Sequence, residues 1–287
     1  MQESRSCTSY LLDSASEIVE LADALDHGLV FRGQSNWEWE ITSSLERGTE
    51  GLNHSERADC EAATLKGIKQ AEHSVGTLAV RPEDDFSWLA LLQHHGGYTR
   101  LVDFTESFYV ALYFAVRNCP GTDATVWCVP KGPLDGRMVA IQEEAGFELS
   151  GEELPRRLVN NSIEWPDRYR GNRALSVVHA KPSILNQRLA IQQGLFLCPL
   201  NLDRPFMDNL SGGLGVKGSR KPVEWVELPT ELKGVAARAK TIKIIVRSEL
   251  HRDILFHLRR MSITEATLFP GLDGYARSLN YFAMGIE

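Results

Sequence analysis

Two short polar blocks constrain this chain more than any other part of its sequence. The first is Phe31-Arg32-Gly33-Gln34, and the second covers residues 91–115 with the sequence LLQHHGGYTRLVDFTESFYVALYFA. The second block gathers two histidines, two glycines, an arginine and an aspartate within 25 residues. Packing alone does not call for so many polar residue types in one stretch. We therefore predict that the two blocks form the wall of a site.

Hydrophobic spacing and capping residues predict alternating helices and strands around these blocks. We expect helices at 17–25, 56–73, 107–118 and 251–261, and one that starts at Ser87 and stops at Gly96-Gly97. Ser87 is the expected N-cap of the helix that starts there, and Thr105 is the expected N-cap of the helix at 107–118. We expect strands at 100–104, 125–130, 195–200 and 241–246, and one that starts at Val30 and breaks at Gly33.

The chain shows no linker or repeat, so we expect a single domain over residues 1–287 with an irregular loop or flap at about 201–234. Its five cysteines are scattered without a C-x-x-C pair, which argues against a disulfide framework and a zinc ribbon. The sequence contains no apolar run of signal-peptide or membrane-span length. We expect a cytoplasmic protein with no membrane partner.

The formal net charge of −7 argues against a broad basic surface for nucleic acid, which needs clustered lysine and arginine. Two local basic segments remain, at 168–173 and 217–221. A confined anionic partner is compatible with such segments, although each of them is equally compatible with a solvated loop.

Four blocks in a fixed order resemble the FRG domain, a bacterial family named for the tripeptide Phe31-Arg32-Gly33. The other three blocks lie at 93–115, 186–196 and 268–274, so the resemblance covers about 250 residues. The family name does not state an activity.

A more distant similarity links the chain to mono-ADP-ribosyltransferases. Phe31-Arg32-Gly33 resembles the end of their first strand, and Phe104-Thr105-Glu106-Ser107 ahead of Ala111-Leu112-Tyr113-Phe114 resembles their strand-to-helix block. Residues 188–197 are similar to the arginine-then-glutamate segment of transferase toxins that modify DNA, with glutamine near the expected carboxylate. The similarity implies an α+β fold with split, bent β-sheets flanked by helices. It also implies NAD as the ADP-ribose donor and no metal cofactor.

Transfer from NAD passes through an oxocarbenium-like state, so such an enzyme must hold a pyrophosphate and place negative charge near the ribose. Arginine suits the first task because its planar fork binds phosphate oxygens bidentately. The resemblance implies three groups of site residues. The catalytic group is Arg32, Gln193 and Glu265; the NAD-binding group is Arg32, Gly33, Gln34, Asp103, Thr105, Ser107 and Tyr113; the acceptor-binding group is His94, His95, Arg100, Arg188 and Gln192.

Each assignment has a structural alternative. Arg32 is equally suited to tying a loop to Asp103, and Thr105 to capping a helix. The histidines at 94 and 95 end a predicted helix, where its dipole favours a cation. Tyr113 has the spacing of a core aromatic, and Glu265 is equally compatible with a surface position or a cap.

These residues predict a toxin-like ADP-ribosyltransferase that modifies RNA or DNA, with protein as the second choice of acceptor. The resemblance implies a role in a toxin–antitoxin pair or in phage defence, with an antitoxin protein as inhibitor. Two alternatives stay open. One is a metal-dependent hydrolase or nuclease using His94, His95, His179 and Asp103, and the other is a non-enzymatic nucleotide-recognition module using Arg32, Arg100 and Arg188.

Overall fold

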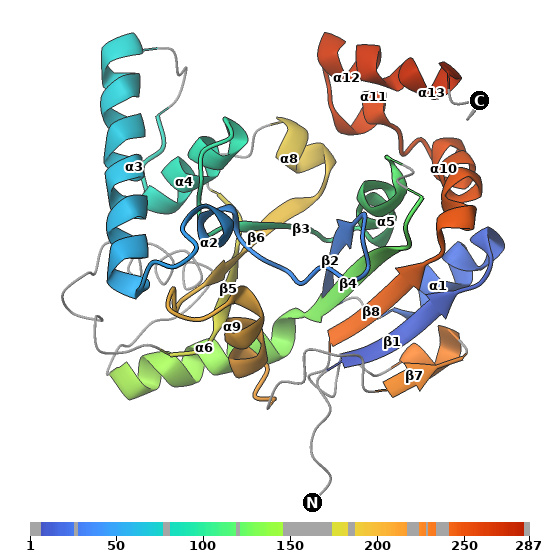
Figure 1. Ribbon diagram of the computed structural model, residues 1–287, viewed down its shortest axis with the longest axis horizontal. Helices are drawn as coiled ribbons and strands as arrows, with labels where there is room; N and C mark the ends of the chain where they lie inside the picture. Colours follow the sequence, from blue (N-terminus) through green and yellow to red (C-terminus); the bar gives the residue numbers. More distant parts are fainter. Residues whose placement is uncertain are drawn as a thin grey trace, which may run out of the picture.

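The computed structural model describes residues 7–25, 28–76, 81–118, 121–145, 174–182, 187–216, 224–227, 229–233 and 241–283. The described strands form one eight-stranded sheet with the order β5-β6-β3-β2-β4-β8-β1-β7 (Figure 1). Their bounds are β1 Cys7–Leu12, β2 Leu29–Gln34, β3 Val102–Thr105, β4 Ala124–Pro130, β5 Val177–Ala180, β6 Gly194–Pro199, β7 Glu224–Val226 and β8 Thr241–Val246. β1 runs parallel to β7 and β8, and the other neighbours are antiparallel.

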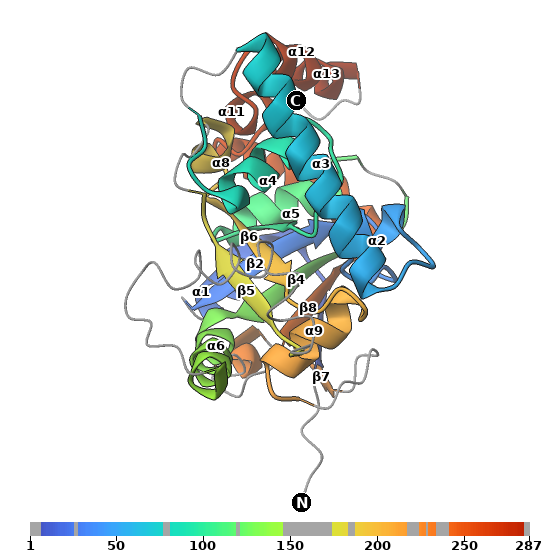
Figure 2. The same ribbon diagram turned by 90° about the vertical axis from the view of Figure 1, so that its left-hand side faces the viewer.

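Helices cover both faces of the sheet (Figures 1 and 2). The longer described helices are α1 Ile18–Ala24, α3 His54–Val75, α4 Asp85–His94, α5 Phe108–Val116, α6 Lys131–Ala145, α9 Phe206–Gly213, α10 His251–Arg260 and α12 Leu272–Ser278. The shorter ones are α2 Ser44–Gly48, α8 Gln187–Ile191, α11 Glu265–Leu268 and α13 Asn280–Ala283. Single turns of 3-10 helix lie at Ala15–Glu17, Pro229–Leu232 and Ser248–Leu250.

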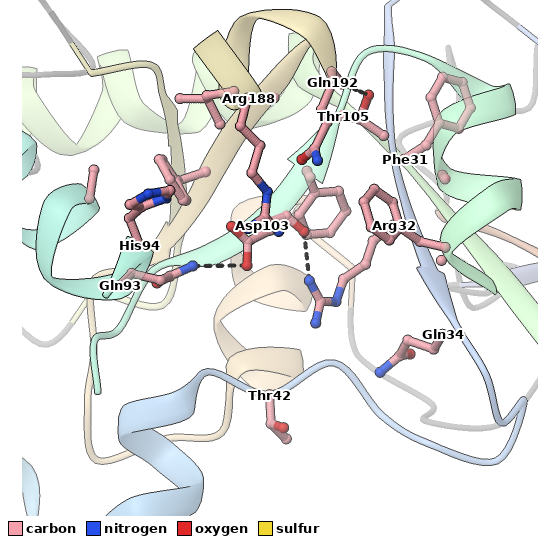
Figure 3. A pocket seen from close by; sticks show the side chains of 18 of the residues that line it. Phe31, Arg32, Gln34, Thr42, Gln93, His94, Asp103, Thr105, Arg188 and Gln192 are labelled. Carbon is pink, nitrogen blue, oxygen red and sulfur yellow. Dashed lines mark hydrogen bonds between the residues drawn. The ribbon is translucent and has the colours of Figure 1, made fainter. Parts of the chain in front are cut away.

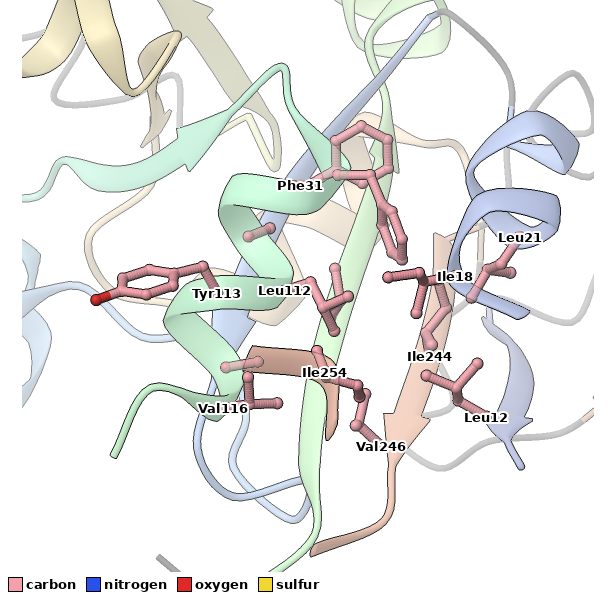
Figure 4. Close-up of a cluster of buried hydrophobic side chains, with 14 of the residues drawn as sticks. Leu12, Ile18, Leu21, Phe31, Leu112, Tyr113, Val116, Ile244, Val246 and Ile254 are labelled. Atoms are coloured by element: carbon pink, nitrogen blue, oxygen red, sulfur yellow. The ribbon is translucent and has the colours of Figure 1, made fainter. Parts of the chain in front are cut away.

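The main core lies between α5, α1 and α10 on one side and strands β1, β2, β4 and β8 on the other. Figure 4 shows Leu112 and Val116 of α5 facing Ile244 and Val246 of β8. A second core lies on the opposite face, where α9 covers β3 and β6 through Phe206. The sheet therefore has an apolar layer on both faces, which makes it the rigid frame of the molecule.

The two halves of the sheet are joined weakly. β2 and β3 share only the residue pair Phe31↔Thr105, whereas β2 and β4 pair over six residues from Leu29 to Gln34. Beyond Phe31 the two strands part, so the backbone of β3 near Asp103 is left without a strand partner on the β2 side. The structure thus has a single mixed sheet where we expected two separate ones. The short pairing between β2 and β3 lies at the first sequence block.

Gly33 is required by the packing of α5 against β2. A Cβ atom at this position would lie 1.9 Å from the carbonyl oxygen of Ala111 and 2.6 Å from the amide nitrogen of Ala115. Both are backbone atoms of α5, so no side-chain rotation relieves the clash. The glycine of the first block therefore lets the helix of the second block lie directly on the strand.

We expect Gly33→Ala to lower the free energy of unfolding by about 3 kcal/mol, because overpacking a rigid contact forces the helix away from the strand. Urea denaturation measures this change. Gly67→Ala is the matched control, because a Cβ atom there meets nothing within 4 Å and alanine favours the helix α3. Equal stability of the two variants would contradict the packing argument.

His251, the first residue of α10, is 1% exposed, and burial lowers its pKa below the usual 6.5. The unfolded chain takes up this proton near pH 6.5, whereas the folded chain resists it until a lower pH. The unfolded state therefore binds more protons below about pH 6.5, and stability falls as the pH falls, by at most about 1.4 kcal/mol per pH unit.

We expect His251→Leu to flatten this dependence between pH 6.5 and pH 5, as judged by thermal melting at each pH. His73→Leu, at an exposed position of α3, serves as the control and should keep the wild-type slope. A His251→Leu variant with an unchanged slope would show that another group causes the acid sensitivity.

The structure confirms the expected strand at 241–246 and shifts the bounds of most other elements by one to three residues. Four expectations were wrong. β2 continues through Gly33 to Gln34 instead of breaking. Ser107 and not Thr105 caps α5, and Asp84 and not Ser87 caps α4. The region expected as a loop at 201–234 contains α9, and its basic segment at 217–221 lies outside the described residues, as does 168–173.

Candidate functional site

A cavity of about 1060 Å³ lies where β2 and β3 part. It is lined by residues from both sequence blocks and by residues from α8 and from the loop after β2 (Figure 3). Four arginines line it against two carboxylates; these residues are Arg32, Arg47, Arg117, Arg188, Glu40 and Asp103. The cavity therefore carries a surplus of positive charge, which suits an anionic ligand. We call it the site cavity.

Arg32 lies at the centre of the site cavity. Phe31 and Gly33 face α5, so the pleat of β2 directs Arg32 to the other side of the strand, toward the gap beside β3. Its Nη1 donates to the carbonyl oxygen of Asp103 over 2.7 Å, and the described residues offer no hydrogen-bond partner to its buried Nε (Figure 3). Burial lowers the pKa of Arg32, which the carboxylate of Asp103 partly offsets. This arginine is half-buried, and its Nε–H group has no hydrogen-bond partner among the described residues.

Asp103 is held in place by a short side-chain relay. The amide Nε2 of Gln93 donates to Oδ2 of Asp103 over 2.8 Å, and the hydroxyl of Thr99 donates to Oε1 of the same glutamine. Asp103 is exposed, and its charge acts on the guanidinium groups of Arg32 and Arg188. The relay fixes a carboxylate in the cavity between two arginines (Figure 3).

Arg188 enters the site cavity from α8. Its guanidinium lies over the ring of Phe269 at 4.4 Å and makes no ion pair or side-chain hydrogen bond with any described residue. Burial lowers its pKa, the carboxylate of Asp103 partly offsets this effect, and the nearby cations Arg117 and Arg277 lower the pKa again. Arg188 therefore presents its N–H donors to the cavity.

The turn between α8 and β6 forms the upper wall. The hydroxyl of Thr105 donates to the carbonyl oxygen of Gln192 over 2.7 Å and accepts from the amide of Ser107 over 3.0 Å. The side chain of Gln192 donates to the carbonyl oxygen of Leu268 over 3.0 Å and lines the cavity. Gln193 has a φ of 49° and does not line it. The preceding glutamine thus faces the ligand space.

Gln34 fixes the lower wall. Its Oε1 accepts from the indole of Trp127 over 2.7 Å, and its Nε2 donates to the carbonyl oxygen of Glu40 over 3.3 Å. The buried Lys243 lies over the ring of Trp127 at 4.7 Å and donates to the carbonyl oxygen of Trp37. These contacts anchor the loop after β2 to the middle of the sheet.

The two adjacent histidines of the second sequence block lie in different surroundings. His94 lines the cavity, and burial lowers its pKa, with further lowering by His95 and Arg188. His95 caps the end of α4 and lies outside the lining. His179 pairs with Asp135 over 2.6 Å. The described residues contain no group of three or more His, Cys, Asp or Glu side chains arranged to hold a metal ion.

Six expected site residues do not line the cavity. Gln193 and His95 are described above, and the assignments of the other four, Arg100, Ser107, Tyr113 and Glu265, are corrected as follows. Arg100 is buried in an ion pair with Glu61 of α3, with Nη2 and Oε2 2.5 Å apart. Ser107 caps α5 by accepting from the amide of Val110. Tyr113 is buried and donates to Glu265 over 2.6 Å.

Glu265 is the most consequential of these corrections. Its carboxylate is buried, accepts from Tyr113 and pairs with Arg277 at 2.8 Å and Arg117 at 3.5 Å. It joins α5, α11 and α12, so we reassign it from catalysis to tertiary structure.

Sequence reasoning missed several cavity residues. Ala111, Phe114, Arg117 and Asn118 recur at helical spacing, and all four line the cavity. This spacing was the sequence signal that could have identified Arg117 and Asn118. Gln93 precedes the histidine pair and was named only as part of the block. Arg47 donates to the carbonyl oxygen and hydroxyl of Thr42, both at 2.9 Å. No sequence pattern marks Arg47 or Trp39.

The family comparison matches the part of the chain that carries most of this geometry. Residues 27–123 match the FRG domain. The FRG segment includes β2, α4, β3 and α5, and therefore Arg32, Gln93 and Asp103. The resembling blocks at 186–196 and 268–274 lie outside the match. Neither the curated proteins nor the solved structures contain a match to the chain. No described helix combines the length and apolarity needed to cross a membrane.

Proposed function

We propose that this chain binds NAD in the site cavity and transfers ADP-ribose from it to a nucleic-acid acceptor. The observation that carries the proposal is the placement of Arg32, whose Nε has no hydrogen-bond partner among the described residues and which lies beside the fixed carboxylate of Asp103 where β2 and β3 part. A half-buried guanidinium suits a pyrophosphate, because charge-assisted hydrogen bonds become stronger where water is partly excluded. An adjacent carboxylate suits the cationic ribose that forms when nicotinamide leaves.

In this proposal Asp103 takes the role that Glu265 had in the sequence-based prediction. The bond between C1′ of the ribose and the nicotinamide nitrogen breaks, and nicotinamide leaves as a neutral molecule with the bonding electrons. The acceptor atom then bonds to C1′ and gives its proton to Asp103. Gln192 offers its Oε1 to a ribose hydroxyl, since its Nε2 is already used by Leu268. Phe114 lines the cavity and replaces Tyr113 as the aromatic beside the nicotinamide.

The nucleic-acid acceptor and the role in a toxin–antitoxin pair or phage defence rest on the resemblance to DNA-modifying toxins and to the FRG family. A mass-shift assay tests the acceptor. The protein is incubated with NAD and, in separate reactions, single-stranded RNA, single-stranded DNA or lysate protein. We expect one ADP-ribose per modified oligonucleotide and released nicotinamide. Modification of protein alone would overturn the nucleic-acid acceptor, and chelator-sensitive hydrolysis would favour the metal-dependent alternative.

Binding without turnover would instead favour the nucleotide-recognition alternative. The surplus of arginines over carboxylates in the cavity is the observation in its favour. That result would support the binding of a nucleotide in the site cavity and would refute the transfer of ADP-ribose.

Replacing the carboxylate of Asp103 distinguishes the transferase from the nucleotide-recognition module. We expect Asp103→Asn to lower the rate of nicotinamide release about 100-fold while NAD binding stays within a few-fold of the wild type, because the amide keeps the shape but cannot accept a proton. Steady-state kinetics and calorimetric titration with NAD measure the two effects. Asp135→Asn, which removes the partner of His179 on α6, is the control. Near-normal turnover by Asp103→Asn would place the acid elsewhere.

A further inference from the structure

A cluster of three arginines surrounds Phe269 at one end of the site cavity. Arg188 lies 4.4 Å, Arg277 5.1 Å and Arg117 5.5 Å from the centre of the ring. Arg117 and Arg188 also line the cavity, whereas Arg277 lies outside the lining and its side chain is 50% exposed. We call these residues the Phe269 cluster; it extends from the cavity to the outer surface.

Among the described residues, two carboxylates act on the three positive charges of the Phe269 cluster, namely Glu265 and, on Arg188 at longer range, Asp103. Glu265 is the only carboxylate with which the three arginines form an ion pair among the described residues, and it pairs with Arg277 and Arg117. It also accepts from Tyr113, so its oxygens are occupied. Arg188 has no ion-pair partner in the described part of the chain, and the nearby cations lower its pKa further. The described part of the cluster therefore keeps a surplus of positive charge, which favours an anionic ligand.

The position of the cluster distinguishes its ligand from the pyrophosphate of NAD. That pyrophosphate is assigned to Arg32, at the parting of β2 and β3. A ligand that also reaches Arg277 must continue out of the cavity. Trp39 lines the site cavity and is 54% exposed, which makes it available for stacking on a base. Cationic side chains together with an exposed aromatic in one cavity are features that bind single-stranded nucleic acid.

We propose that the Phe269 cluster binds a backbone phosphate of a single-stranded nucleic acid, the acceptor strand of the proposed function. Stacking on Phe269 holds the guanidinium groups in place, so little side-chain entropy is lost when phosphate binds. Arg188 supplies donors from inside the cavity and Arg277 from outside. The identification of this strand as the acceptor rests on the proposed function. The binding of the strand to the Phe269 cluster does not require turnover of NAD.

Fluorescence anisotropy with a labelled single-stranded RNA or DNA tests the cluster without NAD. We expect Arg188→Gln and Arg277→Gln each to weaken binding about tenfold or more, and the slope of log Kd against log salt to fall by about 0.7 per lost phosphate contact. Arg188→Gln is the primary variant because it breaks no ion pair among described residues. Arg260→Gln, an exposed arginine of α10, is the matched control and should bind as the wild type does.

Thermal melting of each variant shows whether the fold is kept, and Arg277→Lys, which retains the charge next to Glu265, should recover most of the affinity. Equal affinity of Arg188→Gln and Arg260→Gln would overturn the inference, as would the absence of oligonucleotide binding by the wild type. A loss of NAD affinity with unchanged oligonucleotide affinity would also overturn it, because the cluster would then belong to the dinucleotide.

The two proposals fail separately. Oligonucleotide binding that depends on Arg188 in a protein that releases no nicotinamide would support the Phe269 cluster and refute the transferase. Nicotinamide release with no dependence of oligonucleotide binding on the cluster would do the reverse.

Discussion

Arg32→Ala should raise the dissociation constant for NAD by about 30- to 1000-fold, which corresponds to about 2–4 kcal/mol for a charge-assisted contact with phosphate. The fold should remain, with a change in unfolding free energy below about 1 kcal/mol, because Arg32 makes one hydrogen bond to the carbonyl oxygen of Asp103 and its Nε makes none with described residues. Calorimetric titration and urea denaturation measure the two quantities.

Two further variants make the result for Arg32 specific. Arg32→Lys keeps the charge but loses the planar fork, so we expect an intermediate affinity. Arg260→Ala removes an exposed arginine of α10 and should bind NAD as the wild type does. An Arg32→Ala protein that is unfolded would show that this arginine serves the structure, and one with normal affinity would show that the ligand lies elsewhere.

Glu61→Ala should lower the free energy of unfolding by about 3–5 kcal/mol, the largest stability effect that we expect from a single charge. Glu61 and Arg100 are 1% and 2% exposed. The carboxylate accepts from Nε of Arg100 over 2.7 Å and from its backbone amide over 3.1 Å. Its removal leaves a buried guanidinium without a counter-charge, and α3 loses its fixed attachment to the segment before β3.

The exposed pair formed by Arg137 and Glu144 on α6 provides the control. Glu144→Ala removes a carboxylate that is 3.4 Å from its partner and mostly in solvent, so we expect a change below about 0.5 kcal/mol. Replacing both Glu61 and Arg100 with methionine should restore much of the stability, since no unpaired charge remains. A Glu61→Ala variant as stable as Glu144→Ala would refute the structural role of the pair.

The sequence was sufficient for elements with a strong local pattern. The strand at Thr241–Val246 is an unbroken apolar and β-branched run apart from Lys243, and α10 has an apolar stripe on one side. A contact between Arg32 and Asp103, 71 residues apart in the chain, was expected as the structural alternative to a site role. The reason was that an aspartate between apolar neighbours needs a cationic or hydrogen-bonding partner if it is buried. In the structure the side chain of Asp103 is exposed, and its backbone carbonyl oxygen binds this arginine instead.

The failures share a physical cause, which is that a charged residue does not reveal its partner from local sequence. Arg100 lies three residues from Asp103, yet it points into the core because Glu61 of a distant helix neutralises it. Glu265 has the flanking pattern of a cap or a site residue, but Tyr113 and Arg277 occupy its oxygens. Long-range contacts of this kind decide whether a charge belongs to the site or to the frame.

Nicotinamide release from NAD by the purified protein tests the central claim most directly. The account predicts that the wild type and Arg260→Ala release nicotinamide at equal rates, and that Arg32→Ala releases at least about 30-fold less at NAD concentrations below the wild-type dissociation constant. No release by the wild type, with each candidate acceptor supplied, would contradict the account, and so would equal release by Arg32→Ala.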